Sequence, residues 1–123
     1  MQTPKDLTEQ IIGCAIEVHR NLGPGLLESL YEKALCHEFE MYGIRYVNQC
    51  VVPIVYKGTR IGEHRLDLLV NDKVVVELKA VERMDAVFRA QLLSYLKLTG
   101  NRLGLLINFN VPVLKDGITR ISL

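Results

Sequence analysis

The sequence predicts an α/β fold in which helices flank a mixed β-sheet, with the elements in the order α, α, β, β, β, α, β, β. Two helical stripes open the chain, three β-rich runs follow them directly, and a later helix precedes two further strands. The 123 residues are 49% hydrophobic and 24% charged, which is typical of a folded protein. We therefore expect one domain that spans residues 1–123.

The first expected element is an N-terminal helix, because apolar residues recur there every three or four positions. This stripe consists of Leu7, Ile11, Ala15, Val18 and Leu22. Asp6 or Thr8 is the expected N-cap, and Gly23 is placed to end the helix.

A second helix is expected from about residue 26 to residue 42, with Gly43 as its terminator. The residues expected to face inward are Leu27, Leu30, Tyr31, Ala34, Leu35 and Phe39. Strands are expected at residues 51–56, 61–70 and 74–78. A helix near 85–99, a strand at 103–108 and a short strand at 118–122 complete the prediction.

The hairpin from Glu63 to Lys79 is the most informative segment, because its two strands alternate apolar and charged residues. Opposite residues of an antiparallel pair share a face, so burial favours pairing apolar with apolar. A two-residue turn at Asn71-Asp72 would put Glu77 on the apolar face, where an unpaired carboxylate is costly. We therefore expect a three-residue loop at 71–73. The apolar pairs would be Val70–Val74, Leu68–Val76 and Leu66–Leu78.

This register places Asp67 opposite Glu77 and Arg65 opposite Lys79 on the polar face. Two carboxylates with Cβ atoms about 5 Å apart repel each other unless a cation lies between them. A divalent metal between the acids and a phosphate near the bases would relieve both repulsions. The alternative is a solvated face on which diagonal ion pairs, Asp67 with Lys79 and Arg65 with Glu77, balance the charges.

Asp67, followed ten residues later by Glu77-Leu78-Lys79, resembles the signature of the PD-(D/E)XK nuclease superfamily, although Leu66 stands where the signature has Pro. Four stretches are similar to the GxxExxxR family, which is grouped with these nucleases. They are GLLE (25–28), VVELKA (75–80), AQLLSYL (90–96) and GLLINF (104–109). Glu32 occupies the position of that family's Arg. The resemblance spans nearly the whole chain and implies a restriction-endonuclease-like core.

The resemblance implies that Asp67 and Glu77 ligate Mg²⁺ or Mn²⁺, which are hard cations that prefer oxygen ligands. It implies that Lys79 assists the attacking water and offsets charge in the transition state. Arg65 is a weaker candidate for a contact to the substrate phosphate. The implied function is a metal-dependent phosphodiesterase, a nuclease, that acts on DNA, with RNA as the second choice.

Three further side chains are placed near the site by the resemblance. Glu28 would reach it from the second helix, although the helix dipole alone also favours an acid there. Gln91 and Tyr95 resemble a Gln-x-x-x-Tyr motif of RecB-like nucleases. Gln91 would find its polar partners at the edge of the site, whereas core packing is the expected role of Tyr95. His64 is expected to be a half-buried packing residue.

The composition limits the partners of the chain. The formal net charge is only +1, so a nucleic acid would have to bind a local basic patch. The three cysteines show no paired spacing, and no apolar run reaches the roughly 18 residues of a membrane-spanning helix. We therefore expect a cytoplasmic protein with no membrane contact. The small size leaves open a homodimer, and also a catalytically silent nucleic-acid-binding or assembly module on the same fold.

Overall fold

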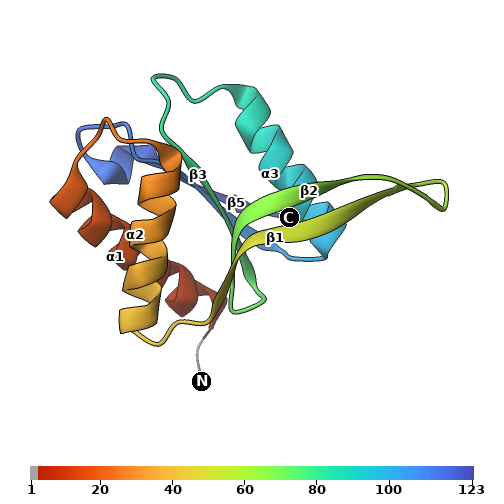
Figure 1. Cartoon of the computed structure of the whole chain (residues 1–123), viewed down its shortest axis with the longest axis horizontal. Coiled ribbons are helices and arrows are strands. Elements are labelled where there is room, and N and C mark those ends of the chain that lie inside the picture. Colours follow the sequence, from red (N-terminus) through yellow and green to blue (C-terminus); the bar gives the residue numbers. More distant parts are fainter. Residues whose placement is uncertain (1–2) are drawn as a thin grey trace.

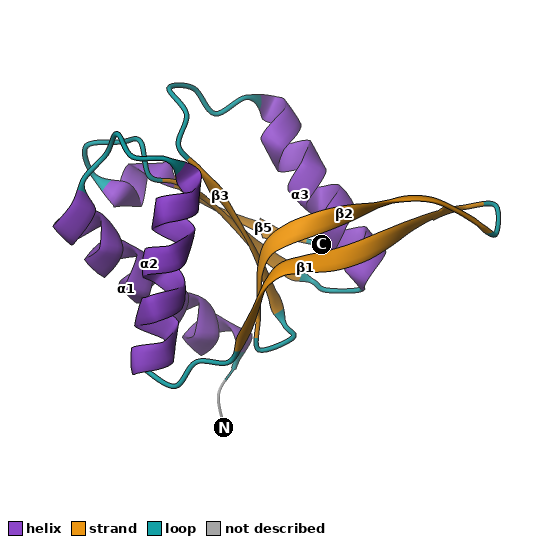
Figure 2. Ribbon diagram, viewed as in Figure 1, coloured by secondary structure: helices purple, strands orange, loops and turns teal. Residues whose placement is uncertain are grey.

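The computed structural model describes residues 3–123, and its elements follow the expected order with one added 3-10 turn. They are α1 (Pro4–Leu22), α2 (Glu28–Met41), β1 (Tyr46–Tyr56), β2 (Thr59–Val70), β3 (Val74–Lys79), α3 (Ala86–Thr99), β4 (Leu103–Asn108), the 3-10 helix η1 (Leu114–Gly117) and β5 (Ile118–Ser122). Helices α1 and α2 lie to one side of the sheet and α3 to the other (Figures 1 and 2). The predicted α/β class, with a mixed sheet flanked by helices, is confirmed.

The sheet contains five strands in the order β1-β2-β3-β4-β5. Only β3 and β4 run parallel to each other, and the other neighbouring strands are antiparallel. A parallel pair needs a crossover connection, and α3 supplies it between β3 and β4. Strand β3 therefore lies in the middle of the sheet, where both of its faces are covered.

Two apolar clusters cover the two faces of the sheet. On the side of α1 and α2, Val74, Val76 and Leu78 of β3 are buried in one cluster. On the side of α3, Val75 of the same strand is buried with Leu92, in the other cluster. Because successive strand residues point to opposite faces, the odd-numbered residues Glu77 and Lys79 belong to the α3 side.

Helix α1 begins one turn earlier than the sequence analysis expected. Its N-cap is Thr3, whose side chain accepts a hydrogen bond from the backbone N–H of Asp6, while the Asp6 carboxylate accepts from the Thr3 N–H. The expected cap at Asp6 or Thr8 is therefore wrong, because Asp6 is the partner in this capping box. Gly23 ends the helix, as expected.

Helix α2 begins at Glu28 and is followed by Gly43, which adopts a left-handed conformation with φ 67°. Its buried residues are Tyr31, Leu35 and Phe39, as predicted. Leu27 and Leu30 were expected to face inward but are exposed, as is Leu22 of α1, and Leu27 has 72% of its surface in contact with solvent. Among the described residues, no helix has both the length and the apolar composition that crossing a membrane requires.

The β2–β3 hairpin adopts the predicted three-residue loop. Val70 pairs with Val74 and Leu68 with Val76. Asn71 and Asp72 both have positive φ, a conformation that Asn and Asp tolerate better than most residues. The Arg45 side chain donates hydrogen bonds to both of them, at 3.3 Å to Asn71 and 2.7 Å to Asp72, and so holds the turn.

The third predicted apolar pair, Leu66 with Leu78, is wrong. Regular pairing of β2 with β3 ends at Leu68–Val76, and Leu66 packs in the cluster on the α3 side, whereas Leu78 packs on the other side. The neighbouring strand β1 shows why, because Gln49, between the pairs Asn48–Leu68 and Cys50–Leu66, has a φ of 52°. This irregularity interrupts the alternation of faces that the prediction assumed.

Beyond this point β1 and β2 continue as a two-stranded ribbon that projects away from the sheet (Figure 1). The strands are longer than expected, since β1 begins at Tyr46 and β2 at Thr59. The place where β2 leaves β3 is also where Asp67 and Glu77 lie.

Candidate functional site

The predicted site residues converge on one open depression on the α3 side of the sheet. Its cavity volume is about 210 Å³. The lining residues are Glu28, His64, Arg65, Asp67, Glu77, Lys79, Phe88, Gln91 and Tyr95. They come from the first turn of α2, from the diverging strands β2 and β3, and from α3. All six candidates from the sequence analysis are among them.

The two carboxylates take over the hydrogen bonds that the diverging strands would otherwise make with each other. The backbone N–H of Leu78 donates to Asp67 Oδ2 at 2.8 Å. The backbone N–H of Asp67 donates to Glu77 Oε2 at 3.4 Å. Each acid is thus anchored to the strand of the other, and the two side chains are neighbours across the hairpin.

Glu77 is buried, with only 7% of its surface exposed. Among residues 3–123, its Oε1 atom is a buried side-chain oxygen that receives no hydrogen bond. Burial, together with the nearby charge of Asp67, raises the pKa of Glu77 to about 9. Ionisation of Glu77 is therefore favoured by a cation beside its Oε1 atom.

Lys79 lies two residues beyond Glu77, with its Nζ 4.4 Å from the centre of the Phe88 ring. The diagonal ion pairs of the alternative interpretation, Asp67 with Lys79 and Arg65 with Glu77, are not among the ion pairs of residues 3–123. Arg65 instead lies 3.7 Å from Glu63, and both side chains are largely exposed. Neither diagonal pair therefore balances the charge of Asp67 or Glu77 within the described residues.

Residues on the helices complete the wall of the depression. Glu28 is the first residue of α2 and is exposed, as is Gln91 of α3. Tyr95, one turn after Gln91, is half-buried and faces the same depression, although packing was its expected role. Burial raises the pKa of Tyr95, and the charges of Glu77 and Asp67 act in the same direction.

His64 is a site residue that the sequence analysis did not identify. It is half-buried as expected, and its ring stacks on Tyr95 with the centroids 3.9 Å apart. Its Nε2 atom also lies 3.8 Å from Glu77 Oε1, inside the depression. Burial lowers the pKa of His64, which favours the neutral ring at neutral pH. Strict alternation along β2 concealed this placement, because Leu66 and Leu68 are buried on opposite sides of the sheet.

The donor set fits a hard divalent cation. Mg²⁺ is typically held by one or two carboxylates, with waters and substrate phosphate as its other ligands. Asp67 and Glu77 provide two such carboxylates, and Glu77 Oε1 provides an oxygen without a hydrogen-bond donor. No group of three or more His, Cys, Asp and Glu side chains that could hold a metal occurs within the described part of the chain.

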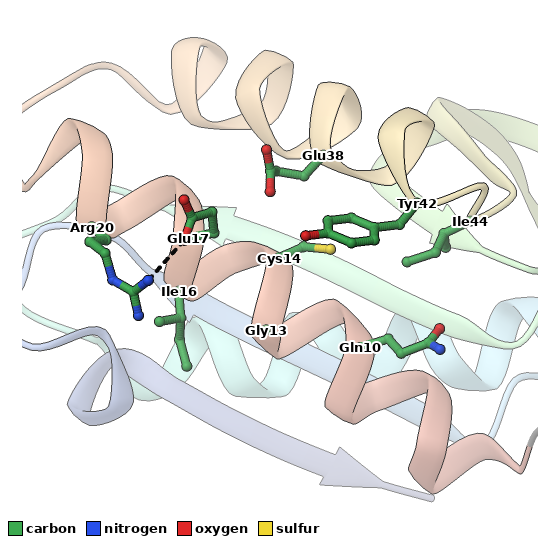
Figure 3. Close-up of a pocket in the computed structure, with 9 residues that line it drawn as sticks. All are labelled: Gln10, Gly13, Cys14, Ile16, Glu17, Arg20, Glu38, Tyr42 and Ile44. Atoms are coloured by element: carbon green, nitrogen blue, oxygen red, sulfur yellow. Dashed lines mark hydrogen bonds and ion pairs between the residues drawn. The ribbon is translucent and has the colours of Figure 1, made fainter.

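A larger cavity, of about 480 Å³, lies elsewhere, between α1 and α2 (Figure 3). Arg20 pairs with Glu17 at 3.0 Å in its wall, and the buried thiol of Cys14 has a pKa raised to about 11 by burial. A thiol with a raised pKa is a poor nucleophile at neutral pH. Despite its size, this cavity shows no unbalanced pair of carboxylates, so the smaller depression is the better candidate.

A mixed sheet flanked by helices, with two acids and a lysine on the diverging strands of a hairpin, defines a restriction-endonuclease-like protein. The comparison with protein families agrees, because the model of the PD-(D/E)XK nuclease superfamily matches residues 5–121. The chain therefore belongs to the PD-(D/E)XK nuclease superfamily. Neither the search of curated proteins nor the search of solved structures gave a match.

Proposed function

We propose that this chain is a metal-dependent nuclease that cleaves phosphodiester bonds in DNA, with Mg²⁺ or Mn²⁺ held by Asp67 and Glu77. The observation that carries the proposal is Glu77 Oε1, a buried carboxylate oxygen without a hydrogen-bond donor beside a second acid. Ionising a buried carboxyl group beside a second acid costs several kcal/mol, and a bound cation would offset that cost. Membership of a nuclease superfamily supports the same conclusion.

A bound divalent cation would activate both the phosphodiester and the attacking water. The roles of the two acids follow from their anchoring. Each accepts a hydrogen bond from the backbone of the opposite strand, which holds its carboxylate in place before any ligand arrives. The acids therefore need little reorganisation to bind a cation, which favours binding.

Lys79 is the proposed catalytic residue that orients the water and offsets negative charge as it develops on the phosphate. It projects from the same strand face as Glu77, and contact with the Phe88 ring limits the positions of its ammonium group. Arg65, at the mouth of the depression, is proposed to contact a substrate phosphate. Gln91 of α3 and Glu28 of α2 also line the depression, where they would position the water or the nucleic-acid backbone.

The motifs GLLE, VVELKA, AQLLSYL and GLLINF support a finer assignment to the GxxExxxR family. Glu32 replaces the arginine of that family, and its side chain accepts a hydrogen bond from Gln49 at 2.8 Å. Gln49 is the residue at the irregularity of β1. In this chain, position 32 therefore supports the backbone beside the site instead of contributing a cation to it.

A catalytically silent nucleic-acid-binding or assembly module is the second candidate. The net charge of +1 favours its assembly role, because no strong global field attracts nucleic acid. Labelled duplex DNA, single-stranded DNA and RNA, incubated with EDTA, Mg²⁺ or Mn²⁺, separate the two candidates. We expect DNA cleavage that requires metal and that Asp67→Asn abolishes, whereas the control Asp116→Asn in η1 retains it. Wild-type protein that binds these substrates but cuts none of them would establish the second candidate.

A further inference from the structure

Apart from His64 and Arg65 at its base, the β1–β2 ribbon (residues 50–66) is a part of the molecule that the proposed chemistry does not use. Its pairs run from Cys50–Leu66 to Tyr56–Thr59, beyond the end of β2–β3 pairing at Leu68–Val76. The base of the ribbon packs on α3 through Val52 and Leu66. The remainder projects from the molecule (Figure 1). At about 3.3 Å per residue, its seven residues on β1 and eight on β2 reach roughly 20 Å from the site.

The tip of the ribbon combines exposed apolar side chains with cations. Val55, Tyr56 and Ile61 are exposed, and Ile61 has 64% of its surface in solvent. Lys57 and Arg60 lie among them, with Lys57 Nζ 5.5 Å from the centre of the Tyr56 ring. Residues 54–61 contain no acid. Exposed apolar side chains that gather in one place indicate an interaction surface. The basic side chains among them favour a polyanion as the partner.

The ribbon has a net positive charge, whereas the rest of the chain does not. Its three basic residues, Lys57, Arg60 and Arg65, outnumber its one acid, Glu63, so its net charge is +2. The whole chain has a net charge of +1, which leaves −1 on the rest. Glu63 is engaged by two of the three cations, at 2.9 Å from Arg60 and 3.7 Å from Arg65. A local basic patch of the kind that a nearly neutral protein needs for nucleic acid is therefore found here.

The base of the ribbon is also the wall of the proposed active site. His64 and Arg65, its last residues before Leu66 and Asp67, line the depression that holds the two acids. A ligand that follows the ribbon toward the sheet thus arrives at Asp67 and Glu77. This continuity connects the basic tip to the chemistry.

We propose that the ribbon lies in the major groove of duplex DNA and so directs the phosphodiester backbone into the depression at Asp67 and Glu77. The inference rests on the proposed nuclease function and adds the surface that holds the duplex. The major groove of B-form DNA, about 12 Å wide, admits a two-stranded β-ribbon. The major groove of an RNA duplex is too narrow and deep for side chains to read. The ribbon therefore selects duplex DNA over duplex RNA.

A second copy of this chain fits the ribbon less well than DNA does. In a two-fold contact through the tip, Lys57 and Arg60 would approach the same residues of the other copy. Like charges in such a contact oppose association, whereas the phosphates of DNA neutralise them. Charge thus favours the polyanion.

The test compares the double variant Lys57→Ala/Arg60→Ala with the matched control Lys33→Ala/Lys115→Ala, which removes two exposed cations from α2 and η1. Fluorescence anisotropy in EDTA measures binding to a 20-base-pair DNA duplex and to the RNA duplex of the same sequence, across a series of salt concentrations. Wild type is expected to prefer the DNA duplex. The ribbon variant should bind DNA about tenfold more weakly. Its slope of log K against log salt should be smaller in magnitude than that of wild type by about 2. The control should change affinity less than twofold, and melting temperatures should show that both variants fold.

Hydrolysis of bis(p-nitrophenyl) phosphate with Mn²⁺ separates this proposal from the nuclease proposal, because so small a substrate cannot reach the ribbon tip. The ribbon variant should retain the wild-type rate. If wild type hydrolyses neither this ester nor DNA while the ribbon variant still loses affinity for DNA, the nuclease proposal fails and the ribbon proposal stands. Three results would each overturn the ribbon proposal. The ribbon and control variants could affect binding equally, or wild type could bind the DNA and RNA duplexes with equal affinity. The third such result is a dimer that only the ribbon variant loses.

Discussion

At the scale of single residues, burial and charge oppose each other at Glu77. Its carboxyl group lies in the interior beside Asp67. Ionisation therefore creates a charge that water cannot solvate and brings two negative charges together. Without a cation, the folded protein retains the Glu77 proton at a pH where the unfolded chain has lost it. The same features that make this residue costly therefore give it affinity for a divalent cation.

The raised pKa of Glu77 predicts how the stability of the metal-free protein depends on pH. The folded state loses this proton near pH 9, whereas the unfolded chain loses it near pH 4.3. Between these values the folded state binds one more proton, so its free energy of unfolding decreases as pH rises, by up to about 1.4 kcal/mol per pH unit. Urea unfolding in EDTA from pH 5 to 9 should show this decrease in wild type and a flatter profile in Glu77→Gln. Parallel profiles of the two proteins would contradict the assignment of the shift to Glu77.

Lys79 distinguishes catalysis from binding. Lys79→Ala should reduce metal-dependent DNA cleavage by a factor on the order of 10² or more, because one group that stabilises transition-state charge is lost. DNA affinity should fall much less, since one phosphate contact is a small part of the interface. Rates and dissociation constants are measured together, with Lys73→Ala in the exposed turn as the control. Equal losses in cleavage and affinity would mean that Lys79 only binds.

The shared face of the charged hairpin residues was predictable, because apolar and charged residues alternate along both strands. Asp67, Glu77 and Lys79 stand out as charges among apolar neighbours, and the structure brings them to one depression. His64 and Phe88 were not recognised, because neither has a charge or spacing that indicates a site. His64 enters the depression because the side chains of β2 change face between Leu68 and Leu66, a property of the folded strands.

At the scale of elements, the site exists because β2 separates from β3 after Leu68–Val76. The apolar pattern of both strands was sufficient to predict the loop and the first two pairs. It could not predict the left-handed Gln49 in the neighbouring strand, which accompanies the change of face at Leu66. By contrast, the capping box of α1 was readable from Thr3 and Asp6, three residues apart as that motif requires.

The loop that follows Lys79 is held by one side chain of β4. Asn108, 2% exposed, accepts hydrogen bonds from the N–H groups of Val81 and Asn110 and donates to the Val81 carbonyl. Asn108→Ala should lower the free energy of unfolding by about 1–3 kcal/mol, because buried backbone groups lose their partners. Denaturant unfolding measures this loss, with Asn101→Ala as the control. A loss no larger than that of the control would show that Asn108 does not hold the loop.

At the scale of the whole molecule, the two sides of the sheet have different roles. The α1–α2 side supplies the larger apolar cluster, and the α3 side leaves the ends of β2 and β3 open beside the projecting ribbon. The sequence predicted this architecture because its segments differ in the spacing of their apolar residues. Apolar residues every three or four positions indicate a helix, and strict alternation indicates a strand. The length and direction of the ribbon were not predictable, since they depend on where β2 leaves β3.

The most direct test of a metal site at Asp67 and Glu77 is the melting temperature of the protein in a titration with Mg²⁺ and Mn²⁺. A cation that binds only the folded state should stabilise wild type by about 2.7 kcal/mol at a hundredfold excess over its dissociation constant. Asp67→Asn and Glu77→Gln should lose this gain, whereas the control Asp116→Asn should keep it. A wild-type melting temperature that does not respond to millimolar Mg²⁺ or Mn²⁺, or an equal response in all four proteins, would contradict the metal site.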